Sequence, residues 1–293
     1  MNCVSSSTEC AISDTEREVL ELQKRLEEAR CRLKNLRPHD DDVAKSPLSP
    51  PSAPTDPSAH FLLLLSDSAL PLGSFAFSSG LESFLAHTSG GLTARPPPPG
   101  HPFTTFLPES ISSFASTNLP FALAAHDDPA TLSELDDVLD AMTICTVGRR
   151  ASTSQGRALL SLWEKSFANS IPPSDATAAL KVFAGDVKSG SLHGHLSPAF
   201  GAVCRAVGME RGQMAYLLVM GHVKALVSAA VRSGVFGPYR AQGVLGGEAV
   251  RRAVREAVAR EWDSSVEEAG QTVPTMDLWI GRHEVLYSRI FNS

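Results

Sequence analysis

The sequence predicts an all-α protein, a single-domain helical bundle preceded by a coiled-coil-like helix and a disordered linker. Three observations indicate this class. From residue 60 onward, Ala- and Leu-rich segments of helical length are separated by Gly, Pro or Ser. Strand signals are missing, since neither sustained alternation nor an Asn-Gly hairpin occurs. The 293 residues are 43% apolar and 20% charged, a globular composition that excludes wholesale disorder.

Residues 1–59 form the predicted N-terminal extension. Within 14–37, apolar residues repeat at alternating spacings of three and four, which is typical of a short coiled coil: Val19, Leu22, Leu26, Ala29, Leu33 and Leu36. Such a helix either binds itself or a partner, or is a lone and partly folded helix, because only about three heptads are available. Residues 38–59 hold six prolines and four serines, which predicts the linker.

The predicted domain covers residues 60–293. Helices are expected at 103–127, 131–147, 149–169, 174–189, 196–207, 209–233 and 240–268. Thr131, Ser174 and Ser197 are expected to cap three of them, and the Pro-rich segment 94–102 is expected to be an exposed loop. The apolar stretch 214–231 approaches membrane-spanning length. Its central Lys224 would cost about 3 kcal/mol in a bilayer, so we expect a core helix and no membrane contact.

Charge and cysteine content limit the function classes. The net charge of −6 argues against a nucleic-acid partner held by bulk charge. The five cysteines are odd in number and form no C-x-x-C, which favours a reducing compartment over a disulfide-stapled secreted fold. The first residues contain neither a basic nor an apolar targeting region. A cytoplasmic location is therefore expected.

Several motifs of catalysis are missing. No Gly-Lys dipeptide occurs, so the phosphate loop of a nucleotide hydrolase is absent. No Ser is flanked as G-x-S-x-G, and His283-Glu284 is not followed by the second His of a zinc protease. These absences favour a protein that is not an enzyme.

His193 and His195 form the only tight histidine pair and are the candidate metal ligands. Side chains two residues apart point to opposite sides of a strand and to nearly opposite faces of a helix, so only a turn would let both bind one metal. No Cys or carboxylate lies close in sequence to complete a site. A loop with capping and packing histidines is the alternative.

The most distinctive stretch is DSALPLGSFAFSSGLE, residues 67–82, called here the signature segment. Leu70-Pro71 ends an apolar run, and Gly73 provides a turn that a side chain would hinder. Phe75 and Phe77 point to the same side if the segment is extended. Ser78 and Ser79 are expected to cap a helix entered at Gly80-Leu81-Glu82.

In this order the residues resemble the signature D-x-x-L-P-x-G-x-[FY]-x-x-S-x-G-L-E of the UreF-type urease accessory proteins, carried here by Asp67, Leu70, Pro71, Gly73, Phe75, Ser78, Gly80, Leu81 and Glu82. Further segments are similar to the family's motifs in the family's order. Arg150, Ser152 and Gly156 lie in one that resembles its R-x-x-S-x-x-x-G-R helix start, and residues 195–201 resemble its H-x-P-x-x-G step. Residues 228–237 are similar to its S-A-A-V-R-L-G-x-x-G helix end. Residues 283–293, called here the C-terminal tail, resemble its H-x-x-L-F-x-R-L-F-x-S end.

The resemblance covers residues 60–293 and implies an all-α homodimer that works in nickel-centre assembly. Its implied partners are the accessory protein UreD (UreH in some bacteria), the nickel-carrying GTPase UreG and apo-urease. Such a protein recruits and regulates the GTPase and has no chemistry of its own. The resemblance implies no tightly bound cofactor and at most transient nickel. His193 and His195 are the local candidates for binding that nickel.

The C-terminal region is the expected partner-binding site. Leu278, Trp279, Leu286, Ile290 and Phe291 have helical spacings that predict one apolar stripe, docked either on its own domain or on a partner. We favour the partner, since aromatic residues beside an arginine are typical of binding hot spots. The predicted contact residues are Phe75, Phe77, Glu82, His283, Tyr287, Arg289 and Phe291.

Two other function classes stay open at this point. An all-α enzyme of another type would use a pocket around Asp67, Glu82 and His87. A coiled-coil adaptor without a role in metal delivery would depend on residues 14–37 alone.

Overall fold

The structure is a computed structural model that describes residues 21, 22, 24–26, 28, 57–88 and 101–292. The chain divides into two units, Met1–Ala53 and Pro54–Ser293. In the first unit the described residues are helical, and Leu22 and Leu26 are 57% and 55% exposed. The rest of the predicted heptad helix, the linker up to residue 56 and the loop residues 94–100 lie outside the described residues.

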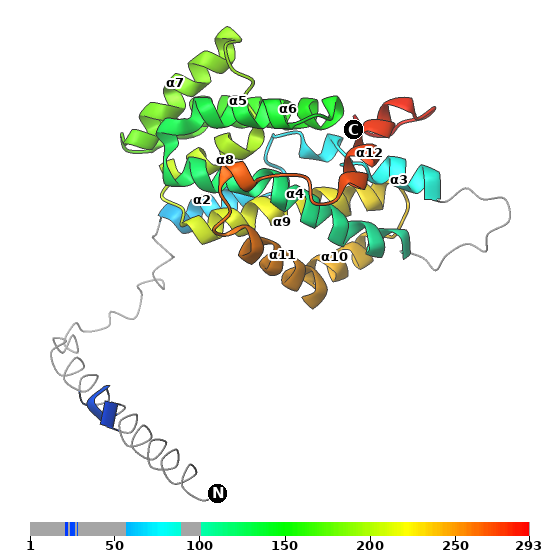
Figure 1. Ribbon diagram of the computed structural model, residues 1–293, viewed down its shortest axis with the longest axis horizontal. Coiled ribbons are helices and arrows are strands. Elements are labelled where there is room, and N and C mark those ends of the chain that lie inside the picture. The colour runs from blue at the N-terminus through cyan, green and yellow to red at the C-terminus, as the bar shows by residue number, and fades with distance from the viewer. Residues whose placement is uncertain (1–20, 23, 27, 29–56, 89–100, 293) are drawn as a thin grey trace, which may run out of the picture. The chain divides into compact units, whose positions relative to one another are not determined.

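The second unit is built from helices, and no strand occurs in the described part of the chain, so the all-α prediction is confirmed (Figure 1). Its α-helices are α2 (Pro57–Ser66), α3 (Leu81–Thr88), α4 (His101–Asp127), α5 (Leu132–Met142), α6 (Thr146–Leu162), α7 (Asp175–Ser189), α8 (Leu196–Ala206), α9 (Arg211–Arg232), α10 (Pro238–Gly246), α11 (Glu248–Glu261) and α12 (Pro274–Arg282). The shorter turns are η1 (Ser74–Ala76), η2 (Pro129–Thr131), the π-helical η3 (Trp163–Phe167), η4 (Ala168–Ser170), η5 (Val266–Glu268) and η6 (His283–Val285).

Some predicted boundaries are wrong. Residues 57–59, assigned to the linker, begin α2, and residues 101–102, assigned to the exposed loop, begin α4. The single helix expected at 240–268 is two helices, because the chain leaves the helical conformation at Gly247, where ψ is 148°. Glycine weakens a helix by about 1 kcal/mol relative to alanine, and two in succession permit this break.

The predicted caps at Ser78 and Ser174 are confirmed, and those at Thr131 and Ser197 are not. The Ser78 hydroxyl accepts from the Glu82 amide in the first turn of α3 at 3.4 Å. The Ser174 hydroxyl accepts from the Thr177 amide in a capping box. Thr131 precedes α5, but its hydroxyl donates to the Asp128 carbonyl. The residue before α8 is His195, so Ser197 lies inside the first turn, where it donates to Asn118 Oδ1 at 2.7 Å.

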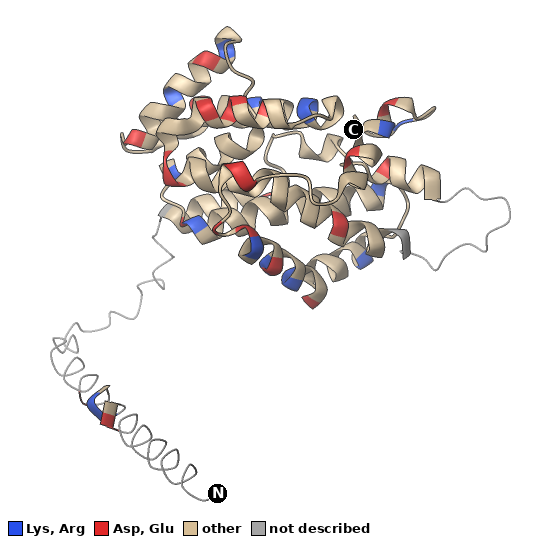
Figure 2. Cartoon of the chain, viewed as in Figure 1, with Lys and Arg blue, Asp and Glu red and all other residues tan. Residues whose placement is uncertain are grey.

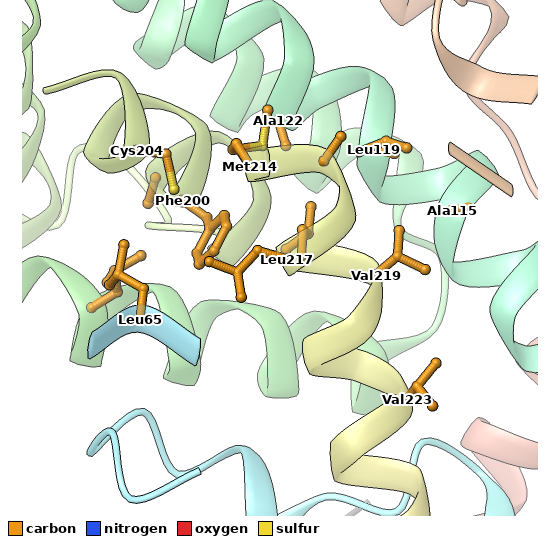
Figure 3. Close-up of a cluster of buried hydrophobic side chains, with 14 of the residues drawn as sticks. Leu65, Ala115, Leu119, Ala122, Phe200, Cys204, Met214, Leu217, Val219 and Val223 are labelled. Carbon is orange, nitrogen blue, oxygen red and sulfur yellow. The ribbon is translucent and has the colours of Figure 1, made fainter. Parts of the chain in front are cut away.

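The core is formed where α4, α8 and α9 meet. Figure 3 shows Leu119 and Ala122 of α4 near Phe200 of α8 and Met214 of α9, all buried. A Cβ at Gly201 would lie 2.1 Å from the Ala122 carbonyl oxygen, so only glycine allows α8 to approach α4 this closely.

Helix α9 is long and apolar enough to cross a membrane by length and composition. In this structure 56% of its apolar window is buried within the protein. The prediction of a core helix at 214–231 is therefore confirmed. The surface helices around it carry both signs of charge, as α11 does with its Arg251–Glu248 and Arg252–Glu256 pairs (Figure 2).

Candidate interaction site at the C-terminal tail

The signature segment contains two turns, each with a glycine in the left-handed region of backbone conformation. Gly73 has φ +71° and Gly80 has φ +85°, so the turn predicted at Gly73 is confirmed. A Cβ at Gly80 would lie 3.0 Å from both the Ile280 amide nitrogen and the Trp279 Cβ. The start of α3 therefore packs directly against α12.

The signature segment is not extended at Phe75 and Phe77, so the condition for these two rings to lie on the same side is not met. Residues 74–76 form the 3-10 turn η1 instead of an extended strand. Phe75 is 62% exposed, whereas Phe77 is 8% exposed. Only Phe75 presents its ring to a partner in this conformation.

Glu82, in the first turn of α3, binds the C-terminal tail. Its Oε2 accepts from His283 Nε2 at 3.0 Å and from the Phe291 amide at 3.3 Å, and its Oε1 accepts from the Ile290 amide at 2.6 Å. The His283 side chain is fully buried. Glu82 and His283 are thus an internal contact between the signature segment and the tail.

The predicted apolar stripe is not one helix. Helix α12 ends at Arg282, and the chain continues through η6 and then without regular structure. Trp279 packs edge-on against Phe84 with ring centroids 5.4 Å apart. Leu278 and Ile290 are exposed while Phe291 is buried, so the tail has an inward and an outward side.

Phe291 fastens the end of the tail. The Arg232 guanidinium, which also donates to the Phe75 carbonyl, lies 4.3 Å from the centroid of the Phe291 ring. One residue later, the Asn292 amide donates to the Ala76 carbonyl at 2.8 Å. Arg232 and Asn292 were missed by the sequence analysis, because nothing in their local pattern connects residues so far apart in the chain.

Charged residues of the tail lie on its outward side. Arg150 of α6 contacts Glu284 Oε1 at 2.5 Å and the Asn292 carbonyl at 3.2 Å. Arg289 contacts Glu284 Oε2 at 3.3 Å. The Arg150 guanidinium, and secondarily that of Arg289, lowers the pKa of Glu284. Tyr287 is fully exposed between these charges in the sequence.

A second cluster holds the histidine pair. The buried Asp136 of α5 accepts the backbone amides of His193 at 2.7 Å, Gly194 at 3.0 Å and His195 at 2.6 Å. Gly194 has φ +77°, so the loop turns here. This turn brings both imidazoles to Asp140 Oδ1, at 3.4 Å from His193 Nδ1 and 3.1 Å from His195 Nε2.

The His195 side chain is a packed internal residue. It is fully buried, and its Nδ1 lies 3.0 Å from Ser152 Oγ. Burial lowers the pKa of His195, although the hydrogen bond with Asp140 opposes the shift. Within the residues that the structure describes, no group of three His, Cys, Asp or Glu side chains is arranged to hold a metal. Asp136 and Asp140, one turn apart on α5, were also missed by the sequence analysis.

The α6 residues of the resemblance surround the same loop. Besides His195, Ser152 Oγ contacts the Leu196 amide at 3.3 Å. A Cβ at Gly156 would lie 2.2 Å from the Gly194 carbonyl oxygen. Ser152 and Gly156 therefore position the loop, and Arg150, further toward the start of α6, reaches the tail.

The signature segment also borders a cavity of about 330 Å³, lined by Asp67, Leu70, Phe75 and His222 among others. The Asp67 carboxylate accepts the Ala69 amide at 2.9 Å, which shapes the turn before Pro71. His87 contacts the Ser83 carbonyl and the Trp279 ring. Asp67 lines this cavity, whereas Glu82 and His87 are not among its lining residues, so the cavity does not bring together the three groups named for an enzyme.

Comparison with known proteins gives a consistent result. The UreF family model matches residues 102–249. A UreF-like urease accessory protein of Schizosaccharomyces pombe is 37% identical over 234 residues, covering 80% of this chain and 97% of the relative. Urease accessory protein F of Oryza sativa subsp. indica is 34% identical over 232 residues, covering 78% of this chain and 82% of the relative. Urease accessory protein UreF of Paenarthrobacter aurescens is 32% identical over 233 residues, covering 78% of this chain and 95% of the relative.

Proposed function

The chain belongs to the UreF family of urease accessory proteins, and from this premise we propose that it acts in urease maturation as a scaffold without catalytic activity. It binds a UreD/UreH-type accessory protein, recruits the nickel-carrying GTPase UreG to apo-urease and so enables nickel insertion. The family establishes the role in urease maturation. The named partners and the order of assembly are the content of the proposal.

The arrangement of the tail supports partner binding there. Exposed apolar side chains on soluble proteins mark interaction sites when they gather on one segment. Leu278, Val285, Tyr287 and Ile290 are between 63% exposed and fully exposed, and they come from α12 and the tail. Phe75, on the adjoining signature segment, is 62% exposed. The buried Phe77, His283 and Phe291 and the partly buried Glu82 contribute by holding these residues in place.

The remaining parts of the proposal concern the state of the protein. It works as a homodimer in the cytoplasm, with neither nucleic acid nor membrane as a partner, and it holds no cofactor tightly. Nickel contact is transient, with His193 as the accessible imidazole, since its side chain is 46% exposed beside Asp140. Calorimetric titration of nickel tests this point, because sub-micromolar binding that His193→Ala abolishes contradicts it.

The experiment for the scaffold role is co-elution with UreD and UreG on a sizing column, with light scattering to give the oligomeric state. Arg289→Ala is expected to weaken assembly by about 2–5 kcal/mol, the usual cost of removing one partner of a charge pair buried in a complex. Arg252→Ala on α11 is the matched control, because Arg252 is also exposed and pairs with one glutamate. Deleting residues 282–293 is expected to abolish assembly.

Two outcomes contradict the proposal. If the truncated protein still co-elutes with both partners, the tail is only an internal contact. If residues 54–293 neither assemble nor restore urease activity while residues 1–53 bind a partner alone, the chain is the coiled-coil adaptor considered from the sequence. Circular dichroism checks that each variant is folded.

A further inference from the structure

A surface cleft lies between α6 and the tail and carries excess positive charge. It is lined by Arg150 and Ser154 of α6, by Glu284, Arg289 and Asn292 of the tail, and by two phenylalanine rings. Among these described residues there are two guanidinium groups and one carboxylate. The cleft is therefore complementary to a further negative group.

Glu284 is shared between the two arginines. One of its oxygens lies 2.5 Å from Arg150 Nη2 and the other 3.3 Å from Arg289 Nη1. The side chains of Arg150, Glu284 and Arg289 are 54%, 41% and 44% exposed. Ion pairs this exposed contribute little to stability, so they exchange easily for an equivalent pair from outside.

The arginines also retain donors for another ligand. A guanidinium offers five N–H groups in a planar fork that suits a carboxylate. Among the described contacts, Arg150 uses its fork for Glu284 and the Asn292 carbonyl, and Arg289 uses its fork for Glu284 alone. The two residues come from distant parts of the chain, so they converge on one position only because the tail is docked.

We propose that this cleft binds a carboxylate side chain of the accessory protein that docks on the tail, and that Glu284 occupies the carboxylate position until that partner arrives. The inference rests on the proposed function, because it assumes partner binding at the tail. It adds the chemistry of the contact and an internal competitor for it. Glu284 thereby lowers the affinity of the free protein for its partner.

The test measures binding of the purified UreD-type protein of the same organism to the full chain at low and high salt. Glu284→Gln is expected to tighten Kd about two- to five-fold at low salt, as expected for release of exposed ion pairs. Its binding is also expected to weaken more steeply with salt than that of the wild type. Adding Arg150→Gln to this variant is expected to remove the gain.

Glu256→Gln on α11 is the matched control, since Glu256 is also an exposed glutamate that faces an arginine. Amide exchange at Ile290 and Phe291 reports whether the tail stays docked in each variant. If Glu284→Gln weakens binding or leaves it unchanged, Glu284 is not a competitor and the inference is wrong. If the wild-type protein does not bind the partner at all, the proposed function itself fails and this inference with it.

Discussion

At the scale of single residues, one closely packed glycine and one partly buried histidine have measurable effects on stability. Gly156 faces the backbone of the histidine loop, where a Cβ would lie 2.2 Å from the Gly194 carbonyl oxygen and 2.6 Å from the His195 carbonyl carbon. Both atoms belong to backbone that Asp136 holds by three hydrogen bonds. The loop therefore cannot move aside cheaply.

Gly156→Ala is expected to reduce the free energy of unfolding by about 2–3 kcal/mol, because it overpacks a rigid contact. Gly185→Ala on α7 is the control, since nothing lies within 4 Å of its added Cβ. That change is expected to be neutral or to stabilise by up to about 1 kcal/mol. Urea denaturation measures both, and equal stabilities of the two variants contradict the close contact.

His222 gives the protein a predictable response to acid. It stacks on Phe114 with ring centroids 4.1 Å apart, and its Nε2 lies 2.9 Å from Ser110 Oγ. Burial lowers the pKa of His222 from 6.5 to about 4. The unfolded chain binds a proton between these pH values and the folded protein does not. Its contribution to stability is therefore complete above pH 6.5 and is lost as the pH falls toward 4.

The expected loss of unfolding free energy from this group is on the order of 3 kcal/mol between pH 6.5 and 4. His222→Gln is expected to flatten the pH dependence by this amount, since glutamine does not titrate. The exposed His60 of α2 provides the control variant His60→Gln. Denaturation at several pH values measures the difference from wild type, and an unchanged slope in His222→Gln shows that His222 titrates normally.

At the scale of elements, the tail is the part whose docking depends on one side chain. Phe291 is 4% exposed under Arg232, whereas its neighbour Ile290 is 63% exposed. Phe291→Ala is expected to lower amide protection at residues 290 and 291 at least about tenfold, because truncating a buried phenylalanine typically costs 3–5 kcal/mol.

Ile290→Ala in the same segment is expected to change that protection less than about twofold, since little of Ile290 is buried. Hydrogen exchange measures both variants, with the thermal midpoint as the control for the helical core. Equal protection in the two variants means that the hydrogen bonds to Glu82 hold the tail without the phenylalanine.

The sequence predicted where individual helices lie better than where they break and how their side chains are arranged. Helix α7 follows from its Ser174 cap and Ala-rich pattern, and α9 from its apolar run. The break at Gly246-Gly247 was missed because Ala, Val, Arg and Glu continue the helical pattern on both sides. Phe75 and Phe77 were expected on the same side only for an extended segment. The turn at Gly73 is followed by the 3-10 turn η1 instead.

At the scale of the whole molecule, the compact unit Pro54–Ser293 contains every contact of the candidate site. We expect residues 54–293 to fold alone with a thermal midpoint within about 2 °C of the full chain, and to keep most urease maturation. A cut after residue 59 is expected to be worse, because it removes the first turn of α2, where Ser58 is buried. Thermal denaturation and urease activity in a strain lacking the gene check this. A large loss of stability on removing residues 1–53 contradicts it.

The candidate site depends on contacts that local sequence cannot show. Asp136 reaches amides 57 to 59 residues away, and Glu82 reaches amides 208 and 209 residues away. Residue types and motifs identified the participants Glu82, His283 and Phe291. Their burial and mutual bonding depend on how the helices pack, and this information is spread over the whole chain.

These long separations also set an order in time during synthesis. The signature segment is made about two hundred residues before the residues that donate to Glu82, so the contact closes a loop of about two hundred residues. Domains fold as the chain emerges, but this contact has to wait until Ile290 and Phe291 have also been made. A nascent chain therefore lacks the outward-facing arrangement of Tyr287 and Arg289 until residues 283–292 have emerged. If the tail binds an accessory partner as proposed, a chain that has not yet reached these residues has no docked tail to present to that partner.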